Sequence, residues 1–213
     1  MPNCQLPGYP ATYNYASTLN YVPAIGQLWA CGGYNMADAN KCWAFDGSDW
    51  YELPDSTRCH CFRDTHSLIA GQDLWVTGLQ QTSDLHCFDD EWTSELFNGV
   101  EWVPGPAHPT GEYSWSPCIV HLNYTHSLYT GGYPSVNDTW LYNWQSNAWT
   151  PTGQLNTGRY EHGCAQIEDQ RVMVAGGIYD GNYQFSAEVY DPVTGMKLWY
   201  FLTNSRSYPN PCK

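Results

Sequence analysis

The sequence predicts an all-β protein built from four similar sheets, and three observations support this prediction. The 213 residues include 11 Trp and 17 Tyr, while only 14% are charged, a composition that favours strands over amphipathic helices. Aromatic and β-branched runs are interrupted by 19 Gly and 14 Pro, as in short strands joined by turns. One set of markers also recurs along the chain with a period of about 50 residues, the length of a propeller blade.

The recurring marker is a short apolar run that ends in glycine. The four runs occupy residues 28–33, 74–78, 128–132 and 172–177, and their last glycines are 45, 54 and 45 residues apart. An aromatic residue and then a tryptophan follow each run, and these tryptophans are 52, 47 and 50 residues apart. Two units depart from the pattern: Thr77 stands at the expected first glycine of the second, and Trp199 comes late in the fourth. We place the units at 13–55, 56–107, 108–155 and 156–202, within a single domain of residues 1–213.

Each unit reads as four antiparallel strands. The first strand leads through a tight turn into the second, which ends at the glycines, and the third and fourth carry the aromatic residue and the tryptophan. One such sheet has two apolar faces, which are buried only when sheets stack around an axis, as in a β-propeller. We therefore expect Trp50, Trp102 and Trp149 to be buried between sheets.

These units resemble the kelch repeat. His162 with Gly163, the double glycines and residues 188–192 follow the kelch pattern closely, and the resemblance covers residues 13–202. Cys31 before a double glycine and the Cys42–Trp43 pair are similar to Cys-containing, extracellular-type kelch proteins of invertebrates. The resemblance implies a kelch-type β-propeller of four four-stranded blades, as a small closed ring or an arc of a larger propeller.

Charge and hydropathy exclude several classes of partner. The net charge of −13 offers no basic patch for nucleic acid and disfavours anionic lipid. The sequence contains no apolar run of about 18 residues, so it does not predict a helix that inserts into a membrane. The N-terminus, residues 1–4, has no basic region followed by an apolar stretch, so it does not resemble a signal peptide.

Nine cysteines and two glycosylation sequons favour an extracellular, secreted protein, with a cytoplasmic location as the alternative. The sequons begin at Asn123 and Asn137, both in expected turns. Cys31 ends the second strand of its unit and Cys42 begins the third, so these antiparallel neighbours predict a disulfide. Cys4 and Cys212 are a second candidate pair, which would join the chain ends.

The sequence contains no catalytic motif and no cofactor-binding motif, so we expect no enzyme activity. A Cys59–His60–Cys61 step directs its two thiols to opposite faces of a strand, which disfavours zinc. Carboxylates gather at residues 84–95, and a solvated acidic loop explains them better than a calcium site does. Galactose-oxidase-like copper enzymes also use kelch-type propellers, but no motif brings Tyr and Cys together here.

The binding candidates are Arg58, Arg63, Arg159 and Tyr160, which stand just before the first strands of two units. The kelch resemblance implies that Arg and Tyr near this position face the ligand-binding end of the channel, while a purely structural role for the arginines is the alternative. The sequence therefore predicts a non-enzymatic module that binds a protein or glycan through its loops. An intracellular kelch-type substrate adaptor without its BTB domain is the second hypothesis, and a copper enzyme is the third.

Overall fold

The structure is a computed structural model of the whole chain. It describes residues 18–22, 25–31, 40–57, 65–69, 73–77, 93–107, 109, 116–123, 125–134, 136–192 and 199–202. These residues form four four-stranded sheets, numbered here in chain order.

Every sheet is antiparallel, and the strands of each sheet lie side by side in the order in which they occur along the chain. Sheet 1 consists of β1 (Thr18–Val22), β2 (Gln27–Cys31), β3 (Cys42–Phe45) and β4 (Trp50–Glu52). Sheet 2 consists of β5 (Thr65–Ile69), β6 (Asp73–Thr77), β7 (Thr93–Phe97) and β8 (Trp102–Ala107). Sheet 3 consists of β9 (Cys118–Asn123), β10 (His126–Thr130), β11 (Thr139–Asn143) and β12 (Ala148–Pro151). Sheet 4 consists of β13 (Gly163–Gln166), β14 (Val172–Ala175), β17 (Ala187–Tyr190) and β18 (Trp199–Leu202).

Two short elements complete the fold. A two-stranded hairpin of β15 (Ile178–Tyr179) and β16 (Asn182–Tyr183) lies between β14 and β17, and a 3-10 turn spans Glu168–Gln170. This turn is the single helical element among the described residues, and none of those residues forms a helix that could span a membrane. The prediction of an all-β protein is confirmed.

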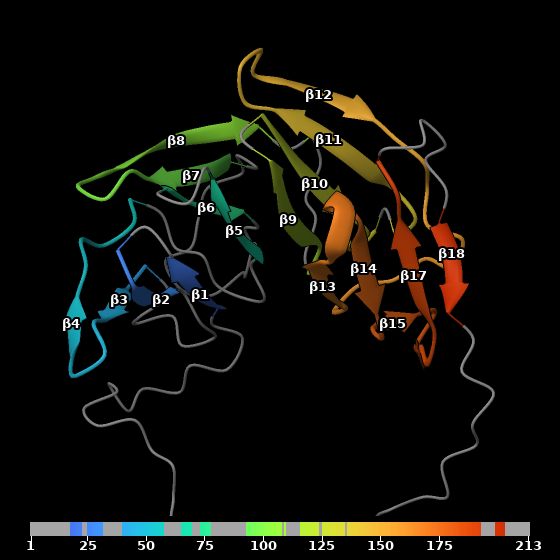
Figure 1. Cartoon of the computed structure of the whole chain (residues 1–213), viewed down its shortest axis with the longest axis horizontal. Helices are drawn as coiled ribbons and strands as arrows, with labels where there is room; N and C mark the ends of the chain where they lie inside the picture. Colours follow the sequence, from blue (N-terminus) through green and yellow to red (C-terminus); the bar gives the residue numbers. More distant parts are fainter. Residues whose placement is uncertain are drawn as a thin grey trace, which may run out of the picture.

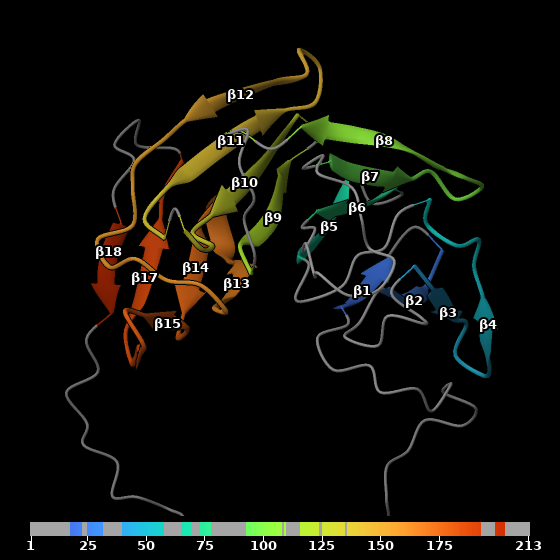
Figure 2. The same ribbon diagram turned by 180° about the vertical axis from the view of Figure 1, so that it is seen from behind.

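The four sheets follow one another around an arc (Figure 1, Figure 2). The first strand of each sheet lies on the inside of the arc and the fourth on the outside. The inner strands contact one another in the order β1, β5, β9, β13. Sheets 1 and 4 lie at the two ends, and the sheets do not close into a ring. The arrangement is therefore radial, as in a propeller, but open.

The strand register corrects the expectation that Trp199 is displaced. Trp199 is paired directly opposite Tyr190, just as Trp50 is paired opposite Phe45. The other two sheets repeat this pairing with Phe97–Trp102 and Tyr142–Trp149. The longer spacing in sheet 4 thus lengthens only the connection between its last two strands.

The register also corrects the alignment of the second unit. Thr77 pairs with Thr65 in the way that Thr130 pairs with Cys118, so Thr77 takes the position just before the glycines. Gly78 therefore takes the place of the first glycine, and it is the second glycine that this unit lacks. Only the pairing between strands reveals this one-residue shift, because the apolar residues of the run fit both alignments.

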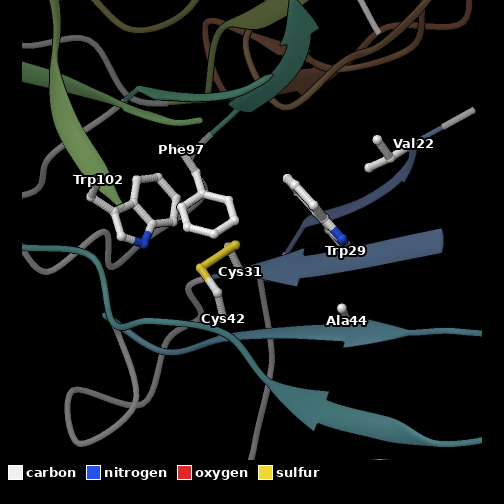
Figure 3. Packing of buried hydrophobic residues seen from close by; sticks show 7 residues of the cluster. All are labelled: Val22, Trp29, Cys31, Cys42, Ala44, Phe97 and Trp102. Atoms are coloured by element: carbon white, nitrogen blue, oxygen red, sulfur yellow. A yellow bond between two sulfur atoms is a disulfide. The ribbon is translucent and has the colours of Figure 1, made fainter. Parts of the chain in front are cut away.

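Among the described residues, buried side chains form three clusters, and each cluster lies at a junction between successive sheets. At the junction of sheets 1 and 2, the rings of Phe97 and Trp102 pack against the Cys31–Cys42 disulfide (Figure 3). Leu96 of sheet 2 packs against the second cluster, which centres on Ile119 and Tyr129 of sheet 3. The third cluster joins sheets 3 and 4 and contains Val120, Leu122, Leu128, Leu155, Val172, Val174 and Tyr190.

The marker tryptophans also hydrogen-bond across two of these junctions. Trp102 Nε1 donates to the Pro54 carbonyl at 2.8 Å, and Trp149 Nε1 donates to the Ala107 carbonyl at 2.7 Å. Trp102 is buried, whereas Trp50 and Trp149 are partly buried. In sheets 2 and 3 the tryptophan of the pair thus both packs against the apolar cluster of its junction and forms a hydrogen bond to the preceding unit.

Candidate interaction surface

The connection from β12 to β13, residues 152–162, lies directly on the glycine pairs of sheets 3 and 4. A Cβ atom at Gly131 would collide with the Arg159 carbonyl oxygen, and a Cβ atom at Gly177 would lie 2.7 Å from the Tyr160 carbonyl oxygen. Both glycines also adopt positive φ, +59° and +89° respectively. The glycine pairs are therefore required because the connecting loop passes against the strand ends.

Arg159 is fully buried at the centre of this loop. Its Nη2 atom lies 2.8 Å from Glu188 Oε1, and neither side chain is exposed to solvent. The guanidinium also donates to the carbonyl oxygens of Gly176, at 2.8 Å, and Ser186, at 3.1 Å. It donates further to the Ser186 hydroxyl at 3.1 Å, and a planar cation with several donors suits a site that offers backbone, hydroxyl and carboxylate oxygens together.

The carboxylate of Glu188 holds the same loop by its backbone. It accepts hydrogen bonds from the backbone nitrogens of Asn156, at 2.8 Å, and Thr157, at 3.0 Å. Glu95 has the same role in sheet 2, where it accepts hydrogen bonds from the backbone nitrogen and the hydroxyl of Thr57. A buried glutamate two residues before the aromatic residue of the third strand is thus a repeated clamp, which the sequence analysis missed.

His162 ends the loop as a buried neutral side chain. Its Nε2 lies 2.8 Å from the Thr130 hydroxyl, and only 7% of the residue is exposed. Burial, together with the nearby charge of Arg159, lowers the pKa of His162 from 6.5 to about 3. At neutral pH this imidazole therefore contributes a hydrogen bond and packing, and no charge.

Tyr160 leads from this buried network to the surface. It forms two backbone hydrogen bonds with Ile178, and its ring meets the edge of the Tyr133 ring with centroids 5.9 Å apart. The adjacent hairpin β15–β16 lies at the lower end of sheet 4 (Figure 1) and adds further aromatic rings. We call Tyr133, Tyr160, Tyr179, Tyr183 and Phe185 the aromatic edge. The exposed fractions are 41% for Tyr133, 42% for Tyr179, 74% for Tyr183 and 99% for Phe185.

Acidic side chains accompany the aromatic edge. Glu161 follows Tyr160 directly and is exposed, and Asp180 is exposed in the turn of the β15–β16 hairpin. The whole chain is also acidic, with a net charge of −13. This surface therefore presents apolar rings within a negative field.

Two of the four predicted binding residues can be located. Tyr160 belongs to the aromatic edge, whereas the guanidinium of Arg159 lies inside the protein and is occupied by Glu188. Arg58 and Arg63 lie outside the described residues. The sequence analysis grouped the two residues together, and the structure shows that Arg159 is buried whereas Tyr160 is partly exposed.

The two sequon asparagines both make intramolecular hydrogen bonds. Asn123 accepts from the backbone nitrogen of Thr125 at 3.0 Å, which shapes the β9–β10 turn, and its amide donates to Gln170. Asn137 Nδ2 donates to the Leu155 carbonyl at 2.9 Å. Both side chains are partly buried.

The structure contains two disulfides among the described residues. One joins Cys31 to Cys42, with Cα atoms 4.1 Å apart. The other joins Cys118 of β9 to Cys164 of β13, and so connects the inner strands of sheets 3 and 4. The sequence analysis did not pair these two, although their separation of 46 residues is close to one repeat. Cys4 and Cys212 lie outside the described residues.

No three His, Cys, Asp or Glu side chains converge as metal ligands in the part of the chain that the structure describes. The Cys59–His60–Cys61 step and the acidic residues 84–91 fall outside that part. Arg159 and His162 of the connecting loop, and Glu188, the partner of Arg159, are buried and hydrogen-bonded to the protein, whereas Glu161 of the same loop is exposed.

Comparison with known proteins supports a kelch family. No family model matches the chain. An F-box/kelch-repeat protein of Arabidopsis thaliana is 32% identical over 79 residues, covering 37% of this chain and 20% of the plant protein. Kelch-like protein 24 of Rattus norvegicus and of Homo sapiens is 42% identical over 65 residues, covering 30% of this chain and 10% of each relative. The matches span only a small part of each relative's length.

Proposed function

We propose that this chain is a non-enzymatic interaction module that binds a protein partner through the aromatic edge. The observation that supports this most strongly is the exposure of Tyr183, at 74%, on a hairpin anchored to the loop between sheets 3 and 4, and of Phe185, at 99%, two residues after that hairpin. Exposed aromatic rings gathered on loops of a packed scaffold favour recognition, because such rings supply much of the energy of protein interfaces.

The rigidity of the loop supports the same proposal. The buried pair Arg159–Glu188 and the hydrogen bonds between Tyr160 and Ile178 fix the base of the aromatic edge before any partner arrives. A surface that is already ordered loses less conformational entropy on binding. Because Glu161 and Asp180 flank the rings, the partner we propose presents Lys or Arg beside apolar side chains, which suits cation–π contacts.

The remaining parts of the proposal concern compartment and architecture. Two disulfides, Cys31–Cys42 and Cys118–Cys164, support an oxidising, extracellular compartment of the kind used by Cys-containing kelch proteins. Glycosylation at Asn123 and Asn137 remains a prediction. The open arc of four sheets supports a kelch-type propeller in which each sheet is one blade.

A peptide-display experiment tests the proposed function. The full chain, with its disulfides intact, is screened against random peptides, and we expect enriched sequences that combine Lys or Arg with apolar residues. The double variant Tyr183→Ala/Phe185→Ala should lose at least tenfold in affinity, whereas the control Tyr51→Ala, at another exposed tyrosine on β4, should not. Equal binding by the double variant would contradict the proposal, as would binding of neutral glycans in preference to every peptide.

A further inference from the structure

The same turn joins the third and fourth strands in sheets 1, 2 and 3, where it starts at Asp46, Asn98 and Asn143 respectively. In each turn a side-chain oxygen accepts hydrogen bonds from the backbone nitrogens two and three residues later, over distances of 2.8–3.0 Å. Asp and Asn are typical of such turns, because their short side chains reach the backbone that follows them. The three sites are therefore matched in local geometry.

Asn98 differs from the other two in combining an amide with a glycine that follows it. Asn98 and Gly99 are both exposed, Gly99 has a φ of +91°, and a Cβ atom built on it would meet nothing within 4 Å. Among the described residues, the Gly99 backbone nitrogen donates no hydrogen bond and Asn98 Nδ2 has no partner. The amide nitrogen of the side chain and the next backbone nitrogen are thus both free to react.

Asn143 is the contrasting site. The backbone nitrogen of the next residue, Trp144, donates to the Thr125 carbonyl at 2.9 Å. Asn143 Nδ2 lies 3.2 Å from His126 Nε2, and the Asn143 side chain is partly buried. At this position both nitrogens are held by the fold.

We propose that Asn98 is a site of spontaneous deamidation, at which the protein is modified without an enzyme. The Gly99 backbone nitrogen attacks Asn98 Cγ, and the Cγ–Nδ2 bond breaks as the new N–Cγ bond forms. The side-chain amide leaves as ammonia and takes up the proton that the Gly99 nitrogen gives up. Glycine favours this step because it has no side chain to obstruct the approach, and the two N–H groups on Asn98 Oδ1 stabilise the negative charge that develops there.

Water then opens the five-membered imide at one of its two carbonyl carbons. Opening at Cγ leaves an ordinary aspartate, which fits this turn because Asp46 forms the same hydrogen bonds in sheet 1. Opening at the other carbonyl leaves an isoaspartate, in which the main chain runs through Cγ and is one carbon longer. The longer turn would lie beside Phe97 and Trp102, which pack at the junction of sheets 1 and 2, so this product should be the less stable one.

Both products change the charge of a cavity at this junction. Asn98 and Gly99 line a cavity of about 490 Å³ together with Trp29 and Tyr51. Deamidation puts a carboxylate on this lining and makes the net charge one unit more negative than −13. The inference is independent of the proposed function, because the aromatic edge contains neither Asn98 nor Gly99.

Storage of the full chain in slightly alkaline buffer, with its disulfides intact, tests the proposal. Digestion and mass spectrometry follow the loss of asparagine at Asn98 and at Asn143 in the same sample. We expect the loss at Asn98 to be faster by about tenfold or more, and to speed up with rising pH because the attacking nitrogen must lose a proton. Loss at Asn98 no faster than at Asn143 would overturn the proposal, as would a product without isoaspartate, since only the imide forms it.

The same measurement in concentrated urea separates the effect of the fold from that of the sequence. Unfolding releases the Trp144 nitrogen and the Asn143 amide, so the ratio of the two rates should be smaller in urea than in the folded chain. A larger ratio in urea would mean that the folded turn protects Asn98, which contradicts the proposal.

The variant Asn98→Asp is the matched control for the effect on stability. It carries the charge of both products without the longer main chain, so it should unfold at the same urea concentration as fresh wild-type protein. The isoaspartate form, separated by ion exchange, should unfold at a lower concentration. Equal unfolding of the isoaspartate form and of Asn98→Asp would show that the length of this turn does not matter to the junction.

Discussion

At the residue scale, Arg159 stabilises the junction between sheets 3 and 4 by connecting elements that lie far apart in sequence. It pairs with Glu188 on β17 and donates to the carbonyl of Gly176 after β14, so one side chain fixes the loop against two strands. A buried charge is tolerated only when its hydrogen bonds are satisfied, and here both charges have their partners inside the protein. The pair therefore depends on both members being present.

Replacing Arg159 with Met should destabilise the protein strongly. The substitution leaves the Glu188 carboxylate buried without its counter-charge, which costs about 3–5 kcal/mol. The matched control is Lys41→Met, because Lys41 pairs with Glu52 and Asp55 at the surface and should contribute at most about 1 kcal/mol. Urea unfolding measures both, and similar losses for the two variants would contradict the clamp role of Arg159.

His162 should make stability depend on pH. Its pKa is lowered to about 3 in the folded protein, whereas the unfolded chain binds a proton below about 6.5. The stabilisation from the neutral imidazole is thus complete above pH 6.5 and is lost as the pH falls toward 3, by about 1.4 kcal/mol per pH unit. His162→Gln, measured by urea unfolding from pH 7 to 4, should show a correspondingly shallower loss than the wild type. Parallel curves for the two proteins would count against this account of the buried imidazole.

At the element scale, the strands could be predicted from sequence because their markers recur, while the positions of two markers could not. By spacing along the chain, Trp199 and Thr77 depart from the repeat. By cross-strand pairing, both occupy the positions that the repeat predicts. Spacing along the chain includes the lengths of loops, which vary freely, whereas register depends on hydrogen bonds between strands. For the same reason the Cys118–Cys164 bond was missed: its partners become neighbours only when two sheets stack.

Removing that bond should loosen sheet 4 from sheet 3. The Cys118–Cys164 disulfide closes a loop of 46 residues, and the chain-entropy estimate for such a loop is about 4 kcal/mol. The variant Cys118→Ala/Cys164→Ala should therefore unfold at lower urea concentration. Hydrogen exchange in β13 and β14 should also rise more than in β2 and β3. Equal exchange in all four strands would argue that the bond does not hold the two sheets together.

At the scale of the whole molecule, the fold separates packing from recognition. Apolar side chains between the sheets stabilise the fold, as Phe97 and Trp102 do at the first junction (Figure 3). Because this packing is close, substitutions of the strand residues that take part in it are poorly tolerated. The aromatic edge lies on a loop and a hairpin outside these junctions. The sequence predicted the all-β fold. It could not predict the exposure of Tyr183 and Phe185, because exposure depends on where the hairpin lies against sheet 4.

The central claim is that the sheets stack in sequence order with their inner strands side by side, and disulfide mapping tests it most directly. The unreduced protein is digested with its thiols blocked, and cross-linked peptides are identified by mass spectrometry. We predict one peptide pair that joins Cys31 to Cys42 and another that joins Cys118 to Cys164, because β9 and β13 are neighbours in the arc. If Cys118 is instead found bonded to a different cysteine while Cys164 is free or bonded elsewhere, sheets 3 and 4 do not meet along these strands, and the radial arrangement is wrong.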